Sequence, residues 1–83
     1  MRITIKYLAD FQRVTGKKEE VIVLNGYDKL PLKYISELLI QKYGAKMTPD
    51  PTVQIIVNGK LGELSKEIKD GDSIVIARVL GGG

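Results

Sequence analysis

The residues with the clearest chemical potential in this 83-residue sequence are the last four, Leu80-Gly81-Gly82-Gly83. Glycine has no Cβ, so a run of three can lie extended in a channel too narrow for other residues. Four extended residues reach about 13 Å, which would hold the carboxylate of Gly83 clear of a folded domain. An unhindered carboxylate of this kind suits an enzyme that activates it. The alternative is that residues 80–83 are a frayed end or a cloning remnant.

Two residue types that carry much protein chemistry are missing from the sequence. There is no cysteine, which excludes disulfide bonds, thiolate metal ligands and a cysteine nucleophile. There is no histidine, the side chain most used for acid–base catalysis near neutral pH. We therefore expect no catalytic residue, no metal site and no cofactor bound by this chain. Asp70 and Asp72 are expected to form a tight turn around Gly71, because the other ligands of a calcium loop are absent.

The charge pattern gives no sign of a nucleic-acid or membrane partner. The net charge is +3 with a pI near 9.2, and the lysines are interleaved with Asp and Glu along the chain. This pattern predicts a mildly basic soluble protein rather than a nucleic-acid binder. The first residues are polar at every second position, unlike a signal peptide, and no apolar run approaches the roughly 20 residues that span a bilayer. We expect a cytoplasmic protein.

The first third of the sequence predicts a β-hairpin. Residues 2–8 alternate between polar and apolar side chains, which is typical of a half-buried strand. A turn at 15–18 leads into a second, β-branched strand at 20–24. Residues 9–13 fit either a loop or a short helical turn.

The middle of the sequence predicts one main helix over residues 31–43. Pro31 suits the first helical turn, where its missing N–H costs nothing, and Gly44 is a suitable stop. Apolar residues recur at helical spacing and are expected to form the buried stripe. They are Leu32, Ile35, Leu38 and Leu39.

The last third predicts two further strands. Residues 53–57 form a β-branched run that enters Asn58-Gly59, a strong hairpin signal. Residues 61–69 are expected to hold a short strand and a turn of helix. A turn at 70–72 then precedes the last strand, at 73–79. Together the elements predict an α+β roll of one domain, with the helix across one face of a mixed sheet of four to five strands. The first and last strands are expected to be neighbours.

Several segments, in this order, resemble the β-grasp, ubiquitin-like sulfur carriers. The likeness is to the small subunit of molybdopterin synthase, the thiamine-pathway sulfur carrier, the archaeal small modifiers and the ubiquitin-related modifier. The segments that carry it are Ile3–Tyr7, Ala9, Thr15-Gly16, Glu19-Glu20, Val57-Asn58-Gly59, Asp70–Ile76, Val79 and the glycine run. The resemblance implies a ubiquitin-like β-grasp domain over residues 1–79 and a flexible tail over residues 80–83. Ala77-Arg78-Val79 stands where the synthase subunits often carry proline.

The resemblance implies a reaction at Gly83 that a partner catalyses. An ATP-dependent activating enzyme would adenylate the Gly83 carboxylate, and that partner would supply ATP and metal. The acyl group would then become a thiocarboxylate or be joined to a lysine of a target protein. Two alternatives stay open: an obligate subunit of molybdopterin synthase, working with a large subunit, and a binding module of the same fold with an incidental tail.

Strand parity predicts where such a partner docks. If Ile74 and Ile76 face the core, then Val75 and Ala77 face outward, and Ile56 faces outward beside them on the neighbouring strand. These three residues are expected to form a docking patch, with Arg78 and Val79 close to the tail. Isolated apolar side chains on an open sheet face are also common without function. Lys6 and Arg78 are expected to be solvated charges, with the alternative that they orient the acidic surface of a partner.

Overall fold

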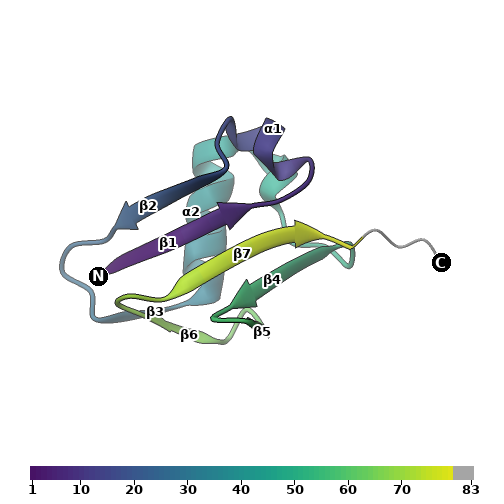
Figure 1. The fold of residues 1–83 in the computed structure, drawn as a ribbon. Coiled ribbons are helices and arrows are strands. Elements are labelled where there is room, and N and C mark those ends of the chain that lie inside the picture. Colours follow the sequence, from purple (N-terminus) through teal and green to yellow (C-terminus); the bar gives the residue numbers. More distant parts are fainter. Residues whose placement is uncertain (80–83) are drawn as a thin grey trace.

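The computed structural model describes residues 1–79, so the expectations for Leu80, Gly81, Gly82 and Gly83 lie outside the described residues. One main helix crosses one face of a mixed, five-stranded sheet, and a two-stranded sheet lies at one end (Figure 1). The elements are β1 (Arg2–Tyr7), α1 (Phe11–Thr15), β2 (Glu19–Val23), β3 (Lys29–Pro31), α2 (Leu32–Tyr43), η1 (Ala45–Met47), β4 (Val53–Val57), β5 (Lys60–Leu61), β6 (Glu67–Lys69) and β7 (Ser73–Arg78). Within residues 1–79, no helix has the length and apolar character needed to cross a bilayer.

The five-stranded sheet has the order β2-β1-β7-β4-β5. β1 and β7 are neighbours, as the sequence predicts; they run parallel, and the other pairs are antiparallel. The hairpin β4–β5 turns at Asn58 and Gly59, whose φ angles of 50° and 82° fit the left-handed turn that this dipeptide favours. The expected α+β roll is therefore confirmed, with β7 at the centre of the sheet.

The core lies between the sheet and α2. It is mostly aliphatic, and alternate residues of β1, β4 and β7 face the helix and enter it. Its buried members are Ile3, Ile5, Tyr7, Phe11, Ile22, Leu32, Ile35, Leu39, Met47, Ile55, Val57, Ile68, Ile74 and Ile76.

The main helix begins one residue later than expected and turns a slightly different face to the sheet. Pro31 is extended and caps α2 rather than forming its first turn. The buried side of α2 includes Ser36, and Ile40 packs against the core. Leu38 was expected in this stripe, but it is only half-buried and lies outside the core. At 3.6 residues per turn, a face centred near Ile35, Ser36 and Leu39 leaves Leu38 on the outer side.

One short segment differs in type from its expectation, and another differs only in its bounds. Residues 61–69 contain no turn of helix; instead β6 pairs with β3, and Ile68 of β6 is fully buried. The sequence did not indicate β3, because a three-residue strand has almost no periodic signal of its own. The helical alternative for residues 9–13 is right, with shifted bounds, because burial of Phe11 fixes α1 against the core.

Candidate functional site

The last described part of the chain is held at the centre of the sheet. β7 is paired on one side with β1 and on the other with β4. The N–H of Val79 donates to the carbonyl oxygen of Thr52 at 2.6 Å, so the pairing extends to the last described residue. Residues 80–83 therefore continue from a strand that both neighbours fix.

The face of the sheet opposite α2 presents the residues that parity placed there. Ile55 and Val57 are buried, whereas Ile56 between them is half-buried. Ile56 lies directly opposite Val75, and Ala77 lies opposite Gln54 one step further along β7. Val75 and Ala77 are also half-buried, so the expected alternation of both strands is confirmed.

Two further leucines join this face, and the sequence analysis missed both. Leu61 of β5 pairs with Ile56 and is 70% exposed. Leu8 follows β1, and its N–H donates to Ile76 O at 3.0 Å, which keeps Leu8 in register beside Ala77. We call Leu8, Ile56, Leu61, Val75 and Ala77 the open-face patch. The Asn-Gly hairpin could have predicted Leu61, because a two-residue turn sets Leu61 opposite Ile56.

Arg78 is not the solvated charge that the sequence suggested. Its Nε donates to both carboxylate oxygens of Asp10, at 3.0 and 3.2 Å, and its Nη1 donates to Thr52 Oγ1 at 2.6 Å. Its guanidinium carbon lies 4.9 Å from the centre of the Phe11 ring. The hydrogen bond from Arg78 lowers the pKa of Asp10 below its ordinary value. Arg78 thus faces the helix side of the sheet, away from the open-face patch.

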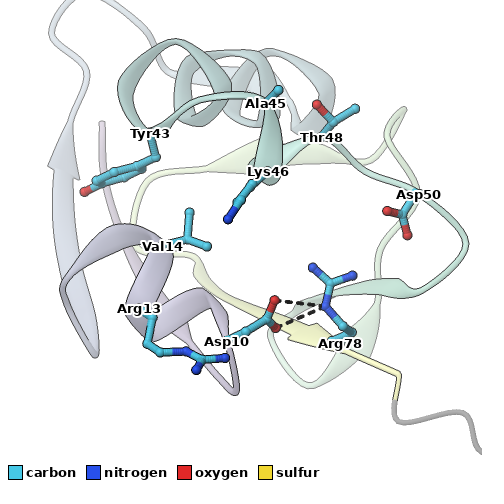
Figure 2. A pocket seen from close by; sticks show the side chains of 9 residues that line it. All are labelled: Asp10, Arg13, Val14, Tyr43, Ala45, Lys46, Thr48, Asp50 and Arg78. Carbon is cyan, nitrogen blue, oxygen red and sulfur yellow. Dashed lines mark hydrogen bonds and ion pairs between the residues drawn. The ribbon is translucent and has the colours of Figure 1, made fainter.

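A polar hollow of about 880 Å³ lies on that helix side, and Arg78 forms part of its wall. Figure 2 shows Lys46 extending into the middle of the hollow, with the Arg78–Asp10 pair beside it. The walls come from α1, the end of α2, η1, β7 and adjoining loops. The lining residues are Asp10, Arg13, Val14, Tyr43, Ala45, Lys46, Thr48, Asp50 and Arg78.

A second polar cluster joins β2 to the end of α2. Tyr7 and Tyr43 both donate to Glu20 Oε2, and Lys42 donates to Oε1 at 2.7 Å. Burial by itself raises the pKa of Glu20, but hydrogen bonds from Lys42, Tyr43 and Tyr7 outweigh it and lower the pKa to about 2. Burial, together with the bond to Glu20, raises the pKa of Tyr7 well above its ordinary range. This cluster fastens the hairpin to the helix.

The two aspartates of the turn before β7 accept hydrogen bonds within the fold. Asp70 Oδ1 accepts a hydrogen bond from Arg2 N at 2.7 Å. Asp72 accepts from Asn58 Nδ2 at 2.9 Å and from Lys69 N at 2.8 Å. Across residues 1–79, no three acidic side chains gather in a way that could hold a metal ion.

Comparisons with known proteins agree with this architecture. No family model matches the sequence, and no curated protein matches it significantly. Among solved structures, SAMP1 from Haloferax volcanii is 18% identical with a TM-score of 0.80, and the match covers 100% of both chains. A putative molybdopterin converting factor subunit 1 from Pyrococcus furiosus is 25% identical with a TM-score of 0.81, over 96% of this chain and 99% of that one.

A third neighbour comes from an assembly. It belongs to a complex of subunits 1 and 2 of molybdopterin-converting factor from Helicobacter pylori, with 24% identity, a TM-score of 0.68 and full coverage of both chains. These matches cover 96–100% of this chain. The chain therefore has the ubiquitin-like β-grasp fold of the sulfur-carrier and small-modifier superfamily.

Proposed function

We propose that this chain is a sulfur carrier or ubiquitin-like modifier whose Gly83 carboxylate is adenylated by an ATP-dependent activating enzyme. The observation that carries the proposal is the position of the glycine run. It follows Val79 and Leu80, just beyond the end of the central strand of a β-grasp domain. The open-face patch lies on the same strand, at Val75 and Ala77, so a partner that binds the patch stands next to the run.

A carboxylate is a poor electrophile, so the proposed reaction first activates the Gly83 carboxylate. A carboxylate oxygen of Gly83 attacks the α-phosphorus of ATP, pyrophosphate leaves, and an acyl-adenylate forms. A sulfur nucleophile then attacks the acyl carbon and expels AMP. Hydrosulfide gives the thiocarboxylate directly, whereas a persulfide needs a thiol to reduce its S–S bond afterwards. A lysine amine attacking the same carbon gives an isopeptide, loses a proton and also expels AMP.

The side chains of this protein indicate which roles it takes in the reaction and which roles the activating enzyme takes. Without histidine, it lacks the side chain most used for acid–base catalysis near neutral pH, and without cysteine it has no thiolate nucleophile. In the proposal, the chain supplies the acyl group and the docking surface. The activating enzyme supplies ATP, metal and catalysis.

The intact mass of protein from its native host tests the proposal. A carrier should show a fraction heavier than the free acid by the difference between sulfur and oxygen. A modifier should give larger adducts in which peptide mapping finds Gly83 on a lysine amine. Native protein with only a free carboxylate, no adducts and no ATP–pyrophosphate exchange with any activating enzyme of the host would overturn both forms of the proposal.

A second candidate is the small subunit of molybdopterin synthase. It is favoured by the 25% identity to a putative molybdopterin converting factor subunit 1 and by the fold shared with a subunit that is seen in complex with a subunit 2. In this role, the Gly83 thiocarboxylate would enter the active site of a large subunit. Stable co-purification with a large subunit, and loss of molybdopterin when the chain is deleted, would favour this candidate over a free-standing carrier.

A further inference from the structure

The polar hollow on the helix side of β7 has no part in the function proposed so far. Two of its charged groups already pair with each other, because the Nε–H of Arg78 is shared between the two carboxylate oxygens of Asp10. A third, Asp50, accepts hydrogen bonds at Oδ1 from Thr52 N at 2.7 Å and from Thr52 Oγ1 at 2.5 Å. These contacts lie within the fold, so they give the hollow its shape.

Arg13 and Lys46 are the remaining charged groups of the hollow. Both side chains are exposed, and neither lies within 4.0 Å of a carboxylate among residues 1–79. The lining therefore has three cationic side chains and two carboxylates. This excess of one positive charge has the same sign as the net charge of the whole chain, which is +3. The space beside Arg13 and Lys46 therefore suits negatively charged groups.

The location of the hollow connects it to the glycine run. β7 presents Ala77 to the open face and Arg78 to the hollow, so the two surfaces lie on opposite sides of one strand end. Residues 80–83 continue from this end of β7, so an enzyme that binds the open-face patch and acts on Gly83 stands beside it. The hollow then lies within reach of the same enzyme, on the other side of the strand.

We propose that the hollow binds an acidic segment of the activating enzyme, whose Asp or Glu side chains pair with Lys46 and Arg13. This inference rests on the proposed function and adds the chemistry of the partner surface. Lys46 reaches the middle of the hollow and takes the inserted carboxylate, while Arg13 binds at the rim. Since both cations are exposed, the contact contributes mainly to the rate and specificity of association and weakens as salt rises.

The test is ATP–pyrophosphate exchange with the host's activating enzyme and the full chain as substrate. The double variant Arg13→Glu/Lys46→Glu should raise the KM for the chain about tenfold and leave kcat unchanged, because the reacting carboxylate is untouched. The difference between this variant and the wild type should shrink as salt increases. Arg13→Lys/Lys46→Arg should restore most of the wild-type KM.

A matched control carries the same change of net charge elsewhere. Lys33→Glu/Lys66→Glu alters two exposed lysines near the start of α2, at the other end of the helix, and should leave KM within twofold. Equal KM values for both double variants would overturn the inference while wild-type exchange still supported the proposed function. Absence of exchange with the wild type would overturn both. The Arg13→Glu/Lys46→Glu variant could instead lose binding of RNA or inorganic phosphate while its KM stays unchanged. That result would also overturn the inference, because the hollow would then bind a ligand other than a protein.

Discussion

Arg78 and Asp10 are bound to each other although 68 positions separate them, with Arg78 Nε 3.0 Å from Asp10 Oδ1. The contact ties the strand that leads to the glycine run to the loop that follows β1. The Phe11 ring also contacts the pair, since the guanidinium lies over it. The end of β7 is thereby fixed on its helix side as well as by its pairing with β4.

This contact should contribute measurably to stability. Arg78→Ala should lower the free energy of unfolding, because the partly exposed ion pair and the cation–π contact are both lost. A double-mutant cycle with Asp10→Ala, followed by urea unfolding, should give a favourable coupling that falls with salt. Arg13→Ala is the exposed control and should change stability little. Coupling near zero would mean that the pair has no energetic role.

The glycine run should be dispensable for folding and essential for activation. Deleting Gly82 and Gly83 should abolish ATP–pyrophosphate exchange, because the carboxylate would no longer reach the activating site. The thermal midpoint should stay unchanged, because the buried core ends at Ile76. Exchange by the shortened chain at the original rate would contradict the proposed role of Gly83.

Adjacent residues of β4 should respond in opposite ways to a charge. Ile55→Asp buries an unpaired carboxylate, costs more than about 3 kcal/mol, and should unfold the domain. Ile56→Asp should keep the fold and raise the KM for the chain in exchange with the activating enzyme. Circular dichroism separates folding from docking in both variants.

The open-face patch can be tested without touching the core. Leu61→Asp should weaken docking at almost no cost in stability, since Leu61 is 70% exposed. Val23→Asp is the matched control: Val23 is 50% exposed, but it lies on the edge strand β2, away from the patch. If both variants docked as well as the wild type, the patch would not be the binding surface.

Glu20 should give the domain an acid-sensitive component of stability. Its pKa falls from an ordinary 4.5 to about 2 in the folded state, so the folded state favours the ionised form. That stability is fully present above pH 4.5 and is lost as the pH falls toward 2, by at most about 3 kcal/mol. Denaturant unfolding from pH 7 to pH 2 measures this loss of stability.

A variant and a matched control test its origin. Glu20→Gln should be less stable at pH 7 and should lack the part of the acid-induced loss that Glu20 causes. Glu19→Gln, on the same strand, should retain that loss. A Glu20→Gln profile parallel to the wild type would count against the cluster.

Local patterns in the sequence were enough for the main framework. Alternating residues predicted β1, a β-branched run before an Asn-Gly turn predicted β4, and the turn at 70–72 predicted the start of β7. Helical spacing predicted α2 to within one residue. Parity also predicted that Ile56 and Val75 share the open face. These features depend on the period of two in strands and 3.6 in helices, which short windows of sequence already contain.

Contacts between distant segments needed the tertiary structure. The pairing of β3 with β6, the bond between Arg78 and Asp10, and the Glu20 cluster each join residues with no common periodic pattern. Leu8 enters the open-face patch only because β1 and β7 are in parallel register. The sequence determined which residues lie in strands and helices and which sides they present. The crossing of α2 and the sheet order then decided which of those sides meet, because packing brings together side chains that lie tens of residues apart.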